Sequence, residues 1–152
     1  MNTMDKAFMI EAINMAKEAR EKGNEPFGAI LVKDNKIVMR ASNQIFSGSD
    51  PTYHAEIGLI RDFCRTNNTS DLSEYTLYTS CEPCCMCAGA MVWSKLGKMV
   101  YSVTHDQLAE IAGSNIMISS EEIFENSPNK PTVLPKLLNE EGLEVFDGYK
   151  FG

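Results

Sequence analysis

Two short segments of the chain carry side chains that can bind a metal and move a proton. They are residues 81–87, Cys-Glu-Pro-Cys-Cys-Met-Cys, and residues 51–56, Pro-Thr-Tyr-His-Ala-Glu. Pro83 suits the first position of a helix, because its missing N–H has no intrahelical partner there. Cys84 and Cys87 then lie one turn apart, so both sulfurs emerge on one side and match half of a tetrahedral zinc site. The positive N-terminus of such a helix also favours ionised thiols.

His54 is the reasonable third ligand, since it precedes a predicted helix and the chain has only two histidines. Three protein ligands leave one position on zinc open, which is typical of a catalytic site rather than a structural one. Water in that position would have its pKa lowered from about 15.7 to about 7, so hydroxide would form at neutral pH. Glu56 follows His54 closely and can take the proton of this water and return it to the leaving group.

Other chemistries for the cysteine cluster stay open. Cys81, Cys84 and Cys87 match part of an iron–sulfur pattern, although Met91 stands where a fourth cysteine would be needed. A closed structural zinc site could use Cys81 as its fourth ligand, and a redox pair could use Cys84 and Cys87. The histidine and glutamate upstream favour the catalytic zinc site over these alternatives.

The cysteine count points in the same direction. The chain has five cysteines, an odd number, and four of them lie between residues 81 and 87. This distribution argues against a disulfide framework and favours metal or redox chemistry. Cys64, Cys81 and Cys85 have no predicted role beyond packing.

Composition and charge narrow the class of protein. The chain has 152 residues, of which 43% are hydrophobic and 23% charged, so we expect one globular domain over residues 1–152. No apolar run reaches the roughly 18 to 20 residues of a membrane span, and residues 1–20 lack the features of a secretory signal. We therefore expect a cytoplasmic protein. The net charge of −7 argues against a nucleic-acid partner, because such proteins neutralise phosphates with Lys and Arg.

Hydrophobic periodicity predicts the elements that position the two segments. Helices are predicted at 4–20, 54–65 and 86–93, and strands at 28–33, 36–46, 75–79 and 98–103. Asp34-Asn35 is predicted as a two-residue turn. The weaker signals beyond residue 104 predict helical turns at 107–112, 121–125 and 132–139 and a last strand at 143–146. This order predicts an α/β fold with helices on both faces of a sheet.

The combination of His-Ala-Glu at 54–56 with Pro-Cys-x-x-Cys at 83–87 resembles the signature of zinc-dependent nucleobase and nucleoside deaminases. The resemblance runs from about residue 23 to residue 103. It implies a three-layer α-β-α cytidine-deaminase-like fold with a mixed five-stranded sheet. It also implies a homodimer that releases ammonia hydrolytically from an amino-substituted ring.

The same resemblance implies roles for individual residues. One Zn²⁺ per chain would be held by His54, Cys84 and Cys87. Glu56 would act as the proton shuttle, and the backbone amide of Ala55 would contact the base.

Further resemblances favour a purine as the substrate. Phe27 lies in a Pro-Phe-Gly-Ala segment like that of purine-type members, and is a candidate contact of the base. Asn43 resembles the base-contacting Asn of guanine and tRNA adenosine deaminases, with a turn-forming Asn as the alternative. Residues 78–84 and Trp93 resemble bacterial guanine deaminase. Trp93 could stack on a flat ring or serve as a core aromatic, and His105 could be a guanine-deaminase-like residue or a surface turn histidine.

Two features depart from guanine deaminases. Ser114 and Asn115 stand where those enzymes carry an acidic pair that contacts the exocyclic amine of guanine, so another heterocycle stays open. We expect Ser114 and Asn115 to contact the substrate in place of that pair. We also expect the longer C-terminal helix of related enzymes to be absent or rebuilt, and Tyr149 and Phe151 could form either a short lid or a frayed tail.

The sequence therefore predicts a guanine-deaminase-like zinc enzyme that acts on a small nucleobase or nucleoside. The alternatives are a tRNA-specific adenosine deaminase, a deaminase of cytosine or another aminoheterocycle, and a non-catalytic zinc-stabilised module. The acidic stretch at 139–148 disfavours tRNA, because it would repel a polyanion.

Overall fold

A five-stranded mixed sheet forms the centre of the computed structural model, which describes residues 3–151. The strands are β1 (Gly28–Lys33), β2 (Lys36–Ser42), β3 (Thr76–Cys81), β4 (Lys98–Val103) and β5 (Thr132–Leu134). Their spatial order is β2-β1-β3-β4-β5, with β1 antiparallel to both neighbours and β3, β4 and β5 parallel. The predicted mixed five-stranded sheet is confirmed. Residues 1, 2 and 152 of the expected domain lie outside the described residues.

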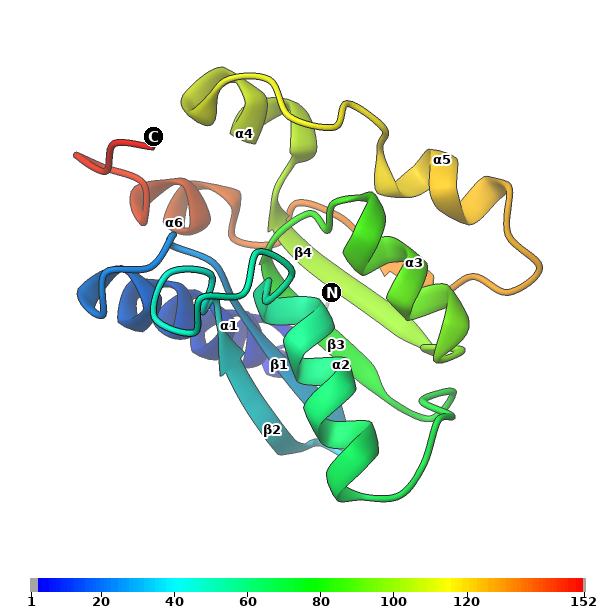
Figure 1. Ribbon diagram of the computed structural model, residues 1–152. Helices are drawn as coiled ribbons and strands as arrows, with labels where there is room; N and C mark the ends of the chain where they lie inside the picture. The colour runs from blue at the N-terminus through cyan, green and yellow to red at the C-terminus, as the bar shows by residue number, and fades with distance from the viewer. Residues whose placement is uncertain (1–2, 152) are drawn as a thin grey trace.

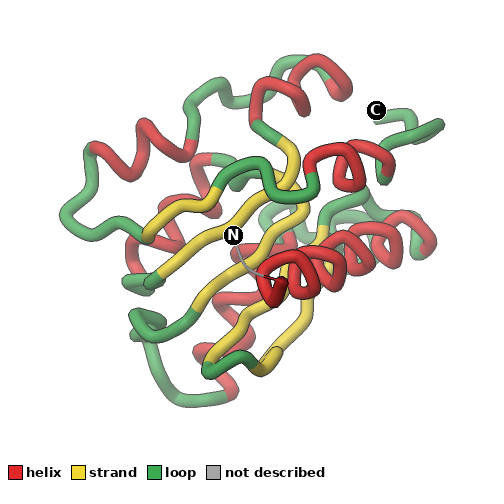
Figure 2. Tube along the Cα trace, turned by 180° about the vertical axis from the view of Figure 1, so that it is seen from behind, coloured by secondary structure: helices red, strands yellow, loops and turns green. Residues whose placement is uncertain are grey.

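Helices cover both faces of this sheet. They are α1 (Thr3–Glu21), α2 (Ala55–Thr66), α3 (Cys85–Trp93), α4 (His105–Ala112), α5 (Ser120–Glu125) and α6 (Asn139–Glu144). In Figure 1, α2 and α3 lie in front of the strands, and Figure 2 shows α1 and α6 on the opposite face. The predicted three-layer arrangement is confirmed. Within residues 3–151 no helix combines the length and apolarity that crossing a membrane requires.

Strand β1 is buried on both faces, which explains its continuous apolar sequence. Ala29 and Leu31 pack into the hydrophobic cluster under α2 and α3, while Ile30 and Val32 pack into the cluster under α1. Successive side chains of a strand point to opposite faces, so this run supplies both cores at once. The strand thereby joins the two helical layers.

The connection from β1 to β2 and onward to α2 follows local rules. Asp34 and Asn35 have φ of 51° and 59°, as a tight hairpin turn requires, and the predicted turn is confirmed. Strand β2 ends at Ser42, earlier than predicted. The reason is that the Ile45 N–H donates to Asn43 Oδ1 over 3.0 Å, which turns the chain away from the sheet.

Two predictions in the C-terminal part are wrong. Residues 132–134 form β5 rather than a helical turn, because they pair with the open edge of β4 and Pro135 then ends the strand. Residues 143–146 do not form a strand, since α6 runs from Asn139 to Glu144 and packs on β4. Gly142 permits this packing, because a Cβ there would overlap the Ser102 side chain.

We predict that Gly28→Ala destabilises the fold through the contact between α1 and β1. A Cβ on Gly28 would meet the backbone of Ala16 and would lie 2.6 Å from the Ala12 carbonyl oxygen. Overpacking of this kind typically lowers the free energy of unfolding by about 1–3 kcal/mol. Gly89→Ala is the matched control, since a Cβ there meets nothing within 4 Å and should stabilise α3 by up to about 1 kcal/mol. Equal urea midpoints for the two variants would contradict the close packing.

Candidate active site

The N-termini of α2 and α3 bring the three predicted ligands together. His54 is the N-cap residue of α2 and Cys84 is the N-cap residue of α3, and neither side chain makes a capping hydrogen bond. The prediction that Cys84 lies inside the helix is wrong, because its backbone is extended with φ −69° and ψ 175° and α3 begins at Cys85. Cys87 follows within the first turn. The ligand atoms of both cap residues are thus available to another partner.

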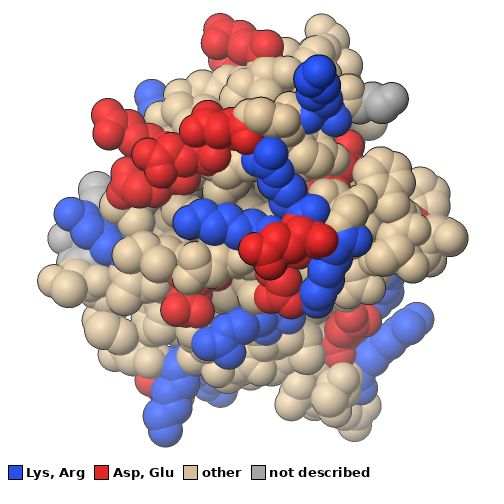
Figure 3. All heavy atoms as spheres, turned by 90° about the vertical axis from the view of Figure 1, so that its left-hand side faces the viewer, with Lys and Arg blue, Asp and Glu red and all other residues tan. Residues whose placement is uncertain are grey.

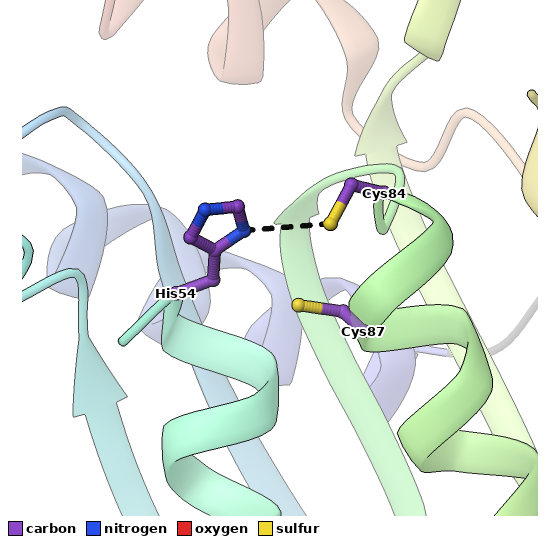
Figure 4. A group of neighbouring side chains, drawn as sticks. All are labelled: His54, Cys84 and Cys87. Carbon is purple, nitrogen blue, oxygen red and sulfur yellow. Dashed lines mark hydrogen bonds between the residues drawn. The ribbon is translucent and has the colours of Figure 1, made fainter. Parts of the chain in front are cut away.

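The geometry of these three side chains fits a tetrahedral metal. The ligand atoms of His54, Cys84 and Cys87 all lie within 4.8 Å of one another, and His54 Nδ1 is 3.5 Å from Cys84 Sγ. Figure 4 shows the three side chains pointing toward one another from the two helix starts. Usual Zn–N and Zn–S bond lengths and tetrahedral angles place such N and S atoms about 3.5 Å apart. The donor set therefore fits zinc.

Hydrogen bonding within the cluster favours one ionised thiol. The Cys87 side chain and, to a lesser extent, His54 lower the pKa of Cys84 to about 4. In return, hydrogen bonding to Cys84 raises the pKa of Cys87 and that of His54. The start of α3 adds its positive end to this stabilisation of negative sulfur. A thiolate beside an imidazole is the ligand chemistry that zinc prefers.

Glu56 lies beside the ligand group without belonging to it. Its side chain is 6% exposed and lines a cavity that His54 and Cys84 also line. Burial, followed by the negative charge of Cys84, raises the pKa of Glu56 to about 7. Cys81 is buried and lines the same cavity but is also outside the ligand group, so the structure does not show a four-ligand site that includes Cys81.

The cavity has a volume of about 550 Å³, within the range of small-molecule sites. Phe27, Ser114 and Asn115 line it, and their contact with the substrate stays a prediction. Phe27 directly precedes β1, and Ser114 and Asn115 belong to the segment after α4. Ala55 is buried as the first residue of α2.

Two other predicted contacts lie elsewhere. Asn43 is fully buried but does not line the cavity, and its Nδ2 has no hydrogen-bond partner among the described residues. Trp93 is 85% exposed and lies outside the cavity, so the structure supports neither stacking on a base in this cavity nor a core position. Six residues of helix carry Trp93 about 9 Å beyond Cys87 and rotate it about 120° away.

The structure adds cavity residues that motif spacing did not reveal. Glu25 directly precedes the Pro26-Phe27 pair, and Glu82 lies inside the cysteine segment, yet neither was predicted to face the substrate. Glu82 accepts hydrogen bonds from the His105 N–H (2.9 Å), the Ser120 N–H (3.3 Å) and the Ser120 hydroxyl (2.5 Å). These bonds tie the starts of α4 and α5 to the cysteine segment. His105 is buried, which contradicts a surface turn.

The C-terminal tail packs against the cavity. Phe151 lines the cavity, and its ring centroid lies 6.2 Å from that of Phe27 and 4.8 Å from that of Tyr149. Arg20 donates hydrogen bonds to the carbonyl oxygens of Val145 (3.0 Å) and Asp147 (2.7 Å), which hold the segment before the tail. This aromatic packing contradicts a frayed tail, while closure of the site by Tyr149 and Phe151 stays a prediction.

Comparisons with known proteins identify the family. Residues 2–103 match the cytidine and deoxycytidylate deaminase zinc-binding region. The chain is 32% identical to a probable cytosine deaminase of Schizosaccharomyces pombe, over 98% of this chain and 94% of that protein. It is 37% identical to the guanine deaminase of Bacillus subtilis, over 75% of this chain and 74% of that protein. A solved structure from work on A-to-I editing by tRNA:A34 deaminases matches with a TM-score of 0.80 and 29% identity, over 91% of this chain and 98% of that chain. The chain therefore belongs to the cytidine and deoxycytidylate deaminase family and is a zinc-dependent hydrolytic deaminase.

Proposed function

We propose that this deaminase acts on a free nucleobase or nucleoside, and that the substrate is a purine of the guanine type. The observation that carries the proposal is a cavity of small-molecule size in which Glu56 and His54 face the same space as Phe27. An aromatic wall and nearby polar groups at Ser114 and Asn115 suit a flat, polar ring. The similarity to the guanine deaminase of Bacillus subtilis supports a purine.

In this proposal His54, Cys84 and Cys87 hold the zinc. When bound, zinc supplies the Lewis acidity that makes water nucleophilic at neutral pH. Glu56 takes a proton from the attacking water and delivers one to the departing amine. A C–O bond forms at the amino-bearing carbon, the C–N bond breaks, and ammonia leaves.

The remaining contacts orient the ring. Phe27 packs on its face, while Ser114 and Asn115 offer hydroxyl and amide groups to its edge. The backbone N–H of Ala55 stays a predicted contact of the base. So does the side chain of Asn43: it does not line the cavity, but its buried Nδ2 is a donor without a hydrogen-bond partner among the described residues. Trp93 has no part in base binding within this cavity, because it lies outside it.

Charge favours a small substrate over tRNA. No lysine or arginine lines the cavity among the described residues, whereas glutamates at 25, 56 and 82 do. Figure 3, which views the side of the molecule on the left of Figure 1, shows acidic and basic side chains interspersed rather than a continuous basic band. Binding of a polyanion depends on such a band. We therefore propose that nucleic acid is not the partner.

Cytosine is the second candidate substrate. The probable cytosine deaminase of Schizosaccharomyces pombe aligns with 98% of this chain, a larger share than the guanine deaminase of Bacillus subtilis reaches. The cavity volume of about 550 Å³ accommodates a pyrimidine as readily as a purine. The two candidates are separated by direct assay.

We also propose a cytoplasmic homodimer. None of the five cysteines, all of which lie within the described residues, forms a disulfide, which suits a reducing compartment. Helix α3 contains no charged residue, and a helix that is apolar on all sides is usually buried. The exposed Trp93 at its end therefore favours a second copy of the chain covering this helix. Sedimentation velocity of the zinc-loaded chain tests the assembly, and a monomer at micromolar concentration would contradict it.

The substrate prediction is tested by ammonia release from the zinc-loaded protein. The panel is guanine, adenine, cytosine, their nucleosides and a tRNA anticodon stem-loop. We expect the highest kcat/KM with guanine, because the cavity suits a small purine and lacks cations for phosphates. Turnover of the stem-loop alone would replace the proposal with tRNA editing, and turnover of cytosine alone would establish the second candidate.

We predict that Glu56→Ala abolishes ammonia release while keeping zinc and fold. Loss of a positioned proton shuttle typically lowers the rate about 10²- to 10⁴-fold. Zinc content per chain and the circular dichroism spectrum should be unchanged, since Glu56 is outside the ligand group. Glu110→Ala, at an exposed position of α4, is the control and should retain wild-type activity. A Glu56→Ala rate within a few-fold of wild type would refute the mechanism.

A further inference from the structure

Three glutamates line the cavity, and two of them already have a partner or a role. Glu56 stands beside the ligand group as the proposed proton shuttle. Glu82 accepts three hydrogen bonds from His105 and Ser120. Glu25 is left over: its side chain makes no hydrogen bond or ion pair with any of residues 3–151.

The environment of Glu25 makes this lack of a partner costly. The residue is half-buried, and burial raises the pKa of its carboxyl, an effect that nearby His54 only partly offsets. A carboxylate removed from water without a hydrogen-bonding partner is destabilising. Most buried polar groups have a hydrogen-bond partner within the protein, and a group without one is expected where a bound ligand supplies the missing hydrogen bond.

The backbone around Glu25 is fixed, so the side chain is presented at a defined place. Asn24 is 1% exposed, and its Oδ1 accepts the N–H groups of Phe46 (3.1 Å) and Ser47 (3.0 Å). Its Nδ2 donates to the Ser47 hydroxyl over 3.0 Å. On the other side, the Phe27 N–H donates to the Glu25 carbonyl over 2.9 Å, and Phe27 itself lines the cavity.

We propose that Glu25 is a specificity-determining residue whose carboxylate accepts a hydrogen bond from the N–H of the five-membered ring of a purine, or from an exocyclic amine other than the one that leaves. This inference rests on the proposed function. An ionised carboxylate can only accept hydrogen bonds, so it selects a ring N–H or a second exocyclic amine over a carbonyl oxygen. It also repels a phosphate, and no lysine or arginine among the cavity residues of the described chain compensates for it.

The test compares matched substrates that differ at one N–H. Guanine is paired with 9-methylguanine, which lacks a ring N–H, and 2,6-diaminopurine is paired with adenine, which lacks a second amine. For the donor-bearing member of the pair that Glu25 recognises, we expect Glu25→Ala to lower kcat/KM about 10- to 100-fold. The other member should change by less than about threefold, since it has no hydrogen bond to lose. A selective effect in the guanine pair would identify a ring N–H as the donor, and a selective effect in the 2,6-diaminopurine pair would identify an exocyclic amine.

Two further variants serve as references. Glu25→Gln keeps an acceptor oxygen of similar size and should lose less selectivity than Glu25→Ala. Glu21→Ala removes an equal charge from an exposed position at the end of α1. It should leave unchanged the ratio of kcat/KM between the two members of each pair. Equal effects of Glu25→Ala on both members of both pairs would overturn the inference.

A binding measurement separates this inference from the proposed function. The same four compounds are titrated by calorimetry into the zinc-loaded Glu56→Ala protein, with and without Glu25→Ala. Selective weakening of the donor-bearing compound supports the role of Glu25 even if the wild-type protein releases no ammonia from any of them, which would defeat only the proposed function. Turnover of a purine with no selective effect of Glu25→Ala in either assay would defeat only the inference.

Discussion

The chemistry of this protein depends on the meeting of two helix N-termini. His54 and Cys84 each occupy the N-cap position, where an extended backbone directs the side chain away from the helix. Neither side chain caps its own helix, so both ligand atoms face the neighbouring helix start. Because a helix N-terminus carries a partial positive charge, the pair also stabilises the thiolate that a metal needs. The sheet under α2 and α3 holds the two starts together, with β1 packed on both faces.

The parts of the fold that were predicted correctly have strong local signals. Strand β1 is a continuous apolar run, and Asp34-Asn35 is a turn that local backbone preferences determine. Strand β5 has only three residues, and its pairing with the edge of β4 supplies the stabilisation that its own sequence lacks. Helix α6 begins after Leu138, which has a φ of 52° and makes no side-chain capping hydrogen bond, while its carbonyl oxygen accepts a hydrogen bond from the distant Ser102 hydroxyl. Such long-range effects leave little trace in a short window of sequence.

The site also combines features with a local sequence signal and features that depend on long-range contacts. The grouping of His54, Cys84 and Cys87 was predictable because their residue types and spacing are those of zinc ligands. The cavity wall is assembled from distant segments, so the inclusion of Glu25 and Phe151 depends on where the segment before β1 and the C-terminal tail lie in the folded chain. The resemblance to guanine deaminase suggested that Trp93 stacks on the base. In the structure six residues of helix rotate Trp93 about 120° away from Cys87, and its side chain is exposed.

Catalysis in this arrangement requires that the protein supply three ligands and no more. X-ray absorption spectroscopy at the zinc edge of the metal-loaded protein counts them directly. We expect two sulfur neighbours, from Cys84 and Cys87, and two nitrogen or oxygen neighbours, of which His54 provides one. A first coordination sphere with three or four sulfur atoms would bring another cysteine onto the metal and contradict a site open to substrate.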